Sequence, residues 1–261
     1  ILLVSTAGTI TITDGADADG LGISAGGTGS VSIIAGVDVV QVADGDIATN
    51  GGTLQVEAAN DVVMADGAVS STSDGDILVS AGNDVTLGSL NAGSGSVLIK
   101  TATGDVLDGG DTDIDVIAGG LAIDAGANIG VVGVGVSDAI DTSVNVLAAS
   151  SDTGYINILE TDDVIIDTVT VTVQQINAAA LPTTFSASQS DLITDAGTLI
   201  LMTVDGSITV NAGLPVTTNP AEAQATALIL ATESRSGVSS NSGNVLLDAQ
   251  GADSDLVLNA D

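Results

Sequence analysis

The chain of 261 residues contains no cysteine and no histidine. Disulfide frameworks and thiolate or imidazole metal sites are therefore excluded, as are Ser-His-Asp and Cys-His mechanisms. Tryptophan is also absent, and Tyr155 and Phe185 are the only aromatic residues. Because aromatic side chains usually fill the wide middle of a globular core, their scarcity indicates a thin core of small and β-branched residues.

Basic residues are almost lacking too. Lys100 and Arg235 stand against 34 acidic residues, which gives a net charge of −32. Such a field repels nucleic-acid phosphates and anionic bilayers, and no basic patch exists, so we exclude nucleic-acid binding. The longest apolar run, residues 129–136, is too short to span a bilayer, which excludes insertion by a membrane helix. The chain begins at Ile1 without a signal-peptide pattern, and we expect a segment of a longer secreted protein.

Glycine is abundant, with 33 residues against three prolines, and a glycine begins each copy of a sequence repeat. The clearest copy runs from Gly75 to Asn91 and places alternate apolar residues on one face of two short strands. We expect the glycines to supply corner backbone angles that other residues avoid. Successive copies begin 20 to 24 residues apart, at Gly8, Gly29, Gly52, Gly75, Gly95 and Gly119.

The second half of each copy repeats as well. Apolar residues recur ten positions after the starting glycine, at Val39, Val62, Val85 and Ile129. They recur again twelve positions after it, at Met64, Leu87 and Val131. A period of this length is the signature of a solenoid. We therefore predict an all-β fold, a parallel β-helix of about 20–24 residues per rung and roughly 11–12 rungs, with the right-handed crossover that parallel strands favour.

The chain is predicted to be one continuous solenoid over residues 1–261, regular in 8–131, with loop insertions in 174–191 and 211–227. After Gly126 two placements of the repeat are open, one on Val144, Val146 and Ala148 and another on Gly154. The spacings from Gly154 to Gly197 and from there to Gly243 are interpreted as two rungs each. Residues 221–231 have helical composition, but a strand is favoured in this setting.

A row of aspartates is the first candidate site. Asp38, Asp61 and Asp84 each lie nine residues after their glycine, with Asn128 at the same place in a later copy. On consecutive rungs, carboxylates about 5 Å apart repel by roughly 1 kcal/mol even in water. Either each aspartate caps its own turn, or the row binds calcium.

Two denser acidic clusters are further candidates for calcium, the one cofactor we consider, although none is required. They comprise Asp14, Asp17 and Asp19, and then Asp108, Asp111, Asp113 and Asp115. Carboxylates that alternate with glycine form the flexible oxygen-rich supply that calcium prefers. Neither cluster matches the EF-hand loop or the nonapeptide of calcium-binding β-rolls.

Catalysis is not expected. Many β-helix proteins cleave polysaccharides, and a pair such as Asp162 and Asp163 has the carboxylates that glycoside hydrolysis uses. Adjacent residues of a strand point to opposite faces, however, and the chain offers no aromatic platform for a sugar. A polysaccharide-active enzyme is therefore the lesser alternative.

Runs such as G-D-I-L-V-S-A-G-N-D-V-T-L, residues 75–87, resemble the repeats of filamentous-haemagglutinin-like exoproteins and related giant bacterial surface adhesins. The resemblance covers residues 8–131 well and 190–261 more loosely. It implies a right-handed β-helical rod and a role in adhesion or in a fibre, outside the cell or at the bacterial surface. The secretion domain that begins such exoproteins is not recognisable in this chain.

Two hypotheses follow for function. In the first, the chain is the shaft of a surface adhesin, continues into further rungs, and holds a tip that binds a surface or matrix ligand away from the cell. In the second, it is a filament or sheath subunit that stacks end to end through exposed strand edges.

Overall fold

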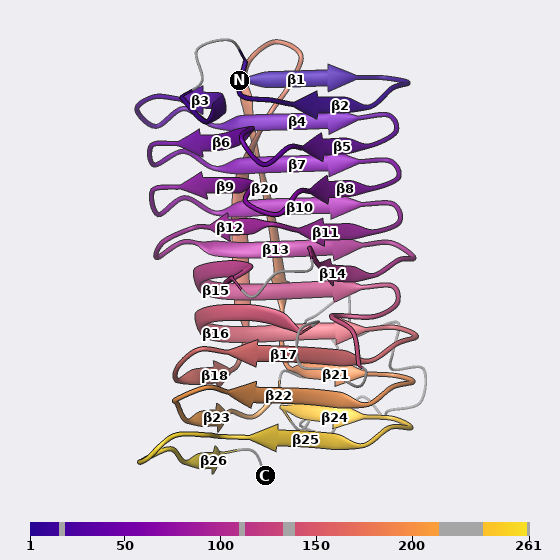
Figure 1. The fold of residues 1–261 in the computed structure, drawn as a ribbon, viewed down its shortest axis with the longest axis vertical. Helices are drawn as coiled ribbons and strands as arrows, with labels where there is room; N and C mark the ends of the chain where they lie inside the picture. The colour runs from indigo at the N-terminus through magenta and orange to yellow at the C-terminus, as the bar shows by residue number, and fades with distance from the viewer. Residues whose placement is uncertain (16–18, 110–112, 133–138, 214–236, 260–261) are drawn as a thin grey trace.

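The computed structural model describes residues 1–15, 19–109, 113–132, 139–213 and 237–259. All the regular secondary structure in these ranges is β-strand. The strands pair in parallel except in one antiparallel hairpin. The predicted all-β parallel solenoid is confirmed (Figure 1). No helix that could cross a membrane occurs in these ranges.

In the N-terminal half, each rung (one turn of the solenoid) has strands in three columns. Column one contains β1 (Leu2–Ser5), β4 (Val31–Ala35), β7 (Leu54–Ala58), β10 (Ile77–Ala81), β13 (Ser96–Thr101), and parts of β15 (Val116–Ala125) and β16 (Ile140–Ser151). Column two contains β2 (Ile10–Ile12), β5 (Val39–Gln41), β8 (Val62–Met64), β11 (Val85–Leu87) and β14 (Val106–Asp108). Column three contains β3 (Leu21–Ala25), β6 (Asp46–Thr49), β9 (Val69–Thr72), β12 (Ser89–Asn91) and the first residues of β15 and β16.

The C-terminal half keeps the stack but changes the cross-section. Columns two and three merge into β17 (Ile156–Glu160), β22 (Leu199–Thr203) and β25 (Val245–Asp248). Column one divides into a first part, β18 (Val164–Ile166), β23 (Ile208–Val210) and β26 (Leu256–Leu258), and a second part, β21 (Leu192–Thr194) and β24 (Val238–Ser240). An antiparallel hairpin, β19 (Val169–Ile176) and β20 (Pro182–Gln189), leaves the column between these parts.

The core is a set of apolar ladders along the axis. In column one, Ile77 pairs with Leu54 on one side and with Val97 on the other, and all three side chains are fully buried. Because side chains alternate between faces of a strand, one in-register pairing places every inward residue over its counterpart in the next rung. In the copies that start at Gly29, Gly52, Gly75, Gly95 and Gly119, the predicted inward positions of the first strand are all buried, which confirms that part of the pattern.

Two details of the predicted register are wrong, and one buried position, Val106, was missed. The copy at Gly8 is displaced by one column, since Ile10 pairs with Val39 of column two. Val131 is 36% exposed rather than inward, because in its rung this column pairs only through the isolated bridges of Ile129. Val106 is the buried residue that continues the ladder of Val85.

The long spacings in the C-terminal half are also one rung each, not two. Ile156 pairs directly with Leu199, and Leu199 pairs with Val245, so the strands after Gly154, Gly197 and Gly243 lie on adjacent rungs. The extra residues between Gly154 and Gly197 include the β19–β20 hairpin, and the described rungs are fewer and longer than expected. Both placements left open after Gly126 hold strands, β16 and β17, on successive faces.

The predicted insertion at 174–191 contains the end of β19, the hairpin turn and all of β20, while the hairpin itself begins earlier, at Val169. Most of the predicted insertion at 211–227, and the strand expected over 221–231, lie outside the described residues.

Close approach, rather than unusual backbone angles, explains the repeat glycines. Gly52 and Gly75 do not have positive φ angles. A Cβ atom on Gly75 would instead overlap the carbonyl oxygen of Gly52 in the preceding rung. Positive φ angles occur at other turn glycines, such as Gly51 and Gly67. The expectation about corner angles is therefore wrong for the glycines that begin a rung.

Buried hydroxyls complete many corners through a motif that the sequence pattern did not single out, Ser or Thr three residues before glycine. The Thr101 hydroxyl donates to the carbonyl of Gly104 at 2.7 Å, and Thr203 donates to Gly206 at 2.6 Å. The Thr194 hydroxyl accepts from the Gly197 N–H at 3.1 Å. The same spacing recurs at Thr49, Thr72, Ser151 and Ser240.

Replacement of Gly75 by alanine tests the role of close approach. We expect Gly75→Ala to lower the free energy of unfolding by about 1–3 kcal/mol, because the added methyl meets backbone that cannot rotate away. Gly26 is the matched control, since a Cβ there meets nothing within 4 Å. Gly26→Ala should raise stability by up to about 1 kcal/mol through the unfolded chain. Equal effects of the two substitutions in denaturant titrations would contradict the explanation.

Candidate functional site

The predicted aspartate row is present as a ladder in the turns between columns one and two. Asp38, Asp61 and Asp84 lie on consecutive rungs just before β5, β8 and β11. Each turn precedes a column-two strand, so in-register pairing of those strands brings the carboxylates one above another. The next rungs extend the ladder with Asp105 and Asn128.

Each carboxylate caps the turn of the following rung, not its own turn as one interpretation expected. Asp38 Oδ1 accepts the N–H of Asp61 at 3.2 Å, and Asp61 Oδ1 accepts the N–H of Asp84 at 3.0 Å. Asp84 Oδ1 accepts the N–H of Asp105 at 2.8 Å. Asp105 in turn accepts the N–H of Asn128 at 2.8 Å. The row therefore links rungs to one another.

Asparagine amides separate the stacked charges. The Asn60 Nδ2 group lies 2.8 Å from Asp38 Oδ1 and 2.9 Å from Asp61 Oδ2. The Asn83 Nδ2 group bridges Asp61 Oδ1 at 3.0 Å and Asp84 Oδ2 at 3.1 Å. Hydrogen bonds from the Asn60 amide, and then from the Asp61 N–H, hold the pKa of Asp38 below its usual value. Donated hydrogen bonds thus offset the repulsion between neighbouring carboxylates.

Sequence reasoning identified the aspartates and missed the asparagines. The available signal is the dipeptide Asn-Asp, which occurs at Asn60–Asp61 and again at Asn83–Asp84. Asp105 was missed because its rung has one extra residue between columns one and two, so that it lies ten rather than nine residues after Gly95.

The two denser clusters contribute mainly local turn bonds. Asp14 accepts the N–H of Gly20 at 2.9 Å, and Asp19 accepts the N–H of Leu21 at 3.0 Å. Asp108 ends β14, Asp113 is exposed, and the buried Asp115 accepts the N–H of Asp141 at 2.8 Å. The remaining two candidates, Asp17 and Asp111, lie outside the described residues. In the described ranges, no three His, Cys, Asp or Glu side chains are grouped to hold a metal ion.

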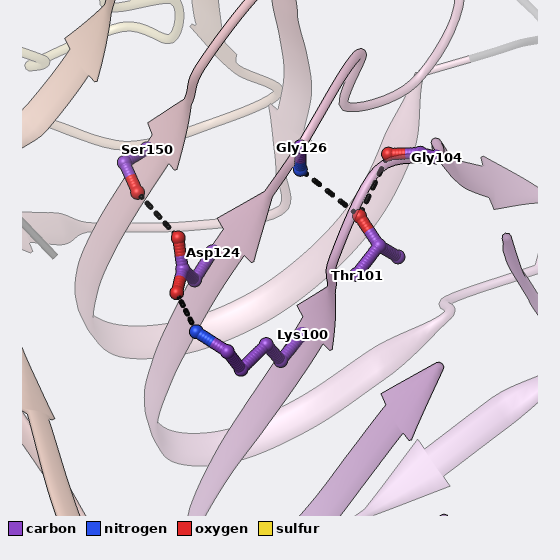
Figure 2. A network of polar contacts seen from close by, with 6 residues as sticks. All are labelled: Lys100, Thr101, Gly104, Asp124, Gly126 and Ser150. Carbon is purple, nitrogen blue, oxygen red and sulfur yellow. Dashed lines mark hydrogen bonds and ion pairs between the residues drawn. The ribbon is translucent and has the colours of Figure 1, made fainter. Parts of the chain in front are cut away.

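Lys100 forms the one ion pair of the described residues, on the outer face of column one. Its Nζ contacts Asp124 of the next rung, and Asp124 accepts from Ser150 of the following rung at 3.2 Å (Figure 2). The Lys100 side chain is 50% exposed, so the pair contributes no more than about 1 kcal/mol. Burial raises the pKa of nearby Asp152, the charges of Asp124 and Asp195 add to the increase, and Lys100 opposes it.

The inner face of the same strand carries a neutral link. Thr101 points away from Lys100, and its hydroxyl accepts the N–H of Gly126 at 3.1 Å while donating to Gly104 (Figure 2). One strand thus bonds to its neighbours through a charged group outside and a hydroxyl inside.

A buried carboxylate that the sequence did not reveal lies where the cross-section changes. Glu160, at the end of β17, is fully buried. Its carboxylate accepts from the Thr142 hydroxyl at 2.6 Å, the Val144 N–H at 3.1 Å and the Thr161 N–H at 3.0 Å. Burial dominates these bonds and raises the pKa of Glu160 to about 7.

Chemically, these groups are suited to holding rungs together. Backbone N–H groups, hydroxyls or amides of adjacent rungs donate to the carboxylates of the aspartate ladder, of Asp115 and of Glu160. Comparisons of the chain with protein-family models, with curated proteins and with solved structures gave no match.

Removal of one ladder carboxylate tests its structural role. Asp61→Ala should lower the free energy of unfolding by about 1–3 kcal/mol, because the N–H of Asp84 and the amide of Asn83 lose their acceptor. Asp66→Ala, at an exposed turn residue of the same rung, removes the same charge and should leave stability within about 0.5 kcal/mol.

The same melting experiments test calcium. Because amide donors already occupy the ladder oxygens, we expect millimolar calcium to change the melting temperature no more than magnesium at equal ionic strength. A calcium-specific increase in the parent protein that Asp61→Ala abolishes would restore calcium binding as the role of the row.

Glu160 gives a pH prediction. Its pKa is about 7 in the folded chain and ordinarily 4.5, so between these values the folded state binds a proton that the unfolded state releases. Glu160 therefore makes its greatest contribution to the free energy of unfolding, about 3 kcal/mol, below pH 4.5. This contribution is lost as pH rises to about 7.

Glu160→Gln mimics the neutral acid and should become the more stable form as pH rises from about 5 to 8. Exposed Glu57→Gln is the control and should follow the parent protein. If parent protein and Glu160→Gln keep a constant difference across this range in denaturant titrations, the assignment is wrong.

Proposed function

We propose that this chain is a non-catalytic structural shaft of an extracellular bacterial surface adhesin or fibre. The observation that carries the proposal is the uninterrupted parallel stack, in which ladders of buried residues follow the long axis. A rod of stacked rungs supplies length and stiffness. The hydrogen bonds from rung to rung at the aspartate ladder support the same role.

Location and partners rest on the repeat's resemblance to filamentous-haemagglutinin-like exoproteins and on charge. The acidic rod avoids anionic bilayers and nucleic acids, as suits a spacer beyond the cell surface. It requires no cofactor, and its partners are the structures joined to its ends, one of which binds a surface or matrix ligand.

A filament or sheath subunit is the second candidate, and the terminal rungs favour it. Among the described residues, β1, β2 and β3 pair on one side only, as do β24, β25 and β26. Apolar residues of these rungs are exposed, including Val4 at 53% and Leu258 at 64%. Further rungs of a longer chain would cover such surfaces, and so would another copy.

Electron microscopy of the purified chain distinguishes the candidates. For a shaft, we expect separate rods on the order of 40 Å long, at about 4.8 Å per rung, that do not elongate with concentration. Elongation that is lost in Leu258→Glu and kept in Val63→Glu would favour the filament over the shaft. Val63 is the matched control because it is 37% exposed on β8, which pairs with β5 and β11 away from both ends of the rod.

A further inference from the structure

The β19–β20 hairpin is inserted into one strand position of column one. On the preceding rung, Leu147 pairs with Ile166 and Ala149 pairs with Leu192. On the next rung, the hairpin and its connections, residues 167–191, are therefore inserted opposite the single residue Ala148. The insertion departs from the face of the rod rather than from a corner.

The hairpin turns back along the rod instead of projecting into solvent. Figure 1 shows β20 running along the long axis, across the direction of the stacked strands. Its two strands pair in a regular antiparallel register from Val169–Gln189 to Ile176–Pro182.

Apolar contacts attach the hairpin to the outside of the solenoid. Val169, Val171 and Val173 are at most 3% exposed. They pack in a second apolar cluster, separate from the inner core, on outward-facing residues of four successive rungs: Leu78, Leu98, Ala122 and Ala148.

Polar contacts continue the attachment toward the N-terminal rungs. Thr172 N–H donates to Asp76 at 2.6 Å, Gln174 N–H to the Thr53 hydroxyl at 2.8 Å, and Ile176 N–H to the Ser32 hydroxyl at 2.9 Å. These acceptors belong to three adjacent rungs and lie 96, 121 and 144 residues away in sequence. The outer edge of β19 is thus hydrogen-bonded to side chains of the rod.

The hairpin is also chemically distinct from the rod. Residues 168–190 contain no charged residue, in a chain of net charge −32. It can therefore lie along the acidic rod without repulsion between like charges. Its outward face carries hydroxyl pairs, such as Thr170 with Ser188 at 2.8 Å and Thr172 with Ser186 at 3.0 Å.

Such a strap changes how a solenoid unfolds. In a simple stack each rung contacts only its neighbours, so the rungs can open one at a time from an end. A segment from the C-terminal half that contacts many earlier rungs couples their opening to its own release.

We propose that the β19–β20 hairpin is a longitudinal strap that makes the rungs of β4, β7, β10, β13, β15 and β16 open as one unit. The apolar cluster anchors the strap, and the bonds to Asp76, Thr53 and Ser32 fasten its distal half. The strap would couple these rungs in the same way in a shaft and in a filament subunit.

Hydrogen exchange, read by mass spectrometry of peptides from the full chain, tests the strap. The double variant Val171→Ser, Val173→Ser removes the buried side chains of the strap. We expect the amides of β4, β7 and β10 to exchange at least about tenfold faster, while those of β22 and β25 keep their rates. The matched control, Ser186→Ala with Ser188→Ala, alters two exposed residues of the same hairpin and should change neither group.

A milder variant covers the case in which the double variant fails to fold. Ser32→Ala removes the hydroxyl that accepts the Ile176 N–H, whereas Ser80→Ala removes a hydroxyl on the same face of column one, in β10. Faster exchange in β7 and β10 for Ser32→Ala alone supports the strap. Unchanged exchange there would overturn the proposal, and so would equal acceleration of β22 and β25, because the hairpin would then add only to overall stability.

Discussion

The structure depends on in-register backbone pairing between rungs about 4.8 Å apart. This pairing places each residue directly over its counterpart, and the rest of the design answers that constraint. Apolar residues benefit, since stacked Val, Ile and Leu form continuous buried ladders. Glycine is needed where one rung approaches the carbonyl of the previous one, as at Gly75 over Gly52. Charged residues are destabilising, because a carboxylate at one position lies close to the like charge at the equivalent position of the next rung.

The chain manages stacked charge by pairing each carboxylate with neutral donors of an adjacent rung. Asn60 and Asn83 separate the ladder aspartates, and the backbone N–H groups of Asp61 and Asp84 donate to the same Oδ1 atoms of Asp38 and Asp61. Lys100 performs the same task for Asp124 at one outer position. The acidic composition is therefore compatible with the stack, although it first suggested a calcium site. Glu160 and Asp152 are exceptions, since burial raises the pKa of both carboxyl groups.

What could be predicted from sequence follows the repeat. Period-two alternation within a period near 22 residues located the buried residues of column one and the aspartates of the ladder, because both recur at fixed spacing. The partners Asn60 and Asn83 recur as well, but their amide role appears only when rungs are stacked. The register failed where spacing varies: at Gly8, at Val131 and after Gly154, where insertions lengthen a rung without adding another. Glu160 occurs once, so no period could reveal it.

The hairpin could be recognised as an insertion but not as a strap, for a physical reason. Its partners Ser32, Thr53 and Asp76 are distant in sequence, and its alternating Val and Thr residues fit any half-buried strand. Such alternation indicates that one face of the strand is buried, but it does not identify the residues that bury it. The outward residues Leu78 and Leu98 held the complementary signal, apolar side chains at positions where neighbouring rungs have Ser32 and Gln55. An unexplained apolar stripe outside a solenoid, together with an uncharged insertion, therefore indicates a segment that folds back along the rod.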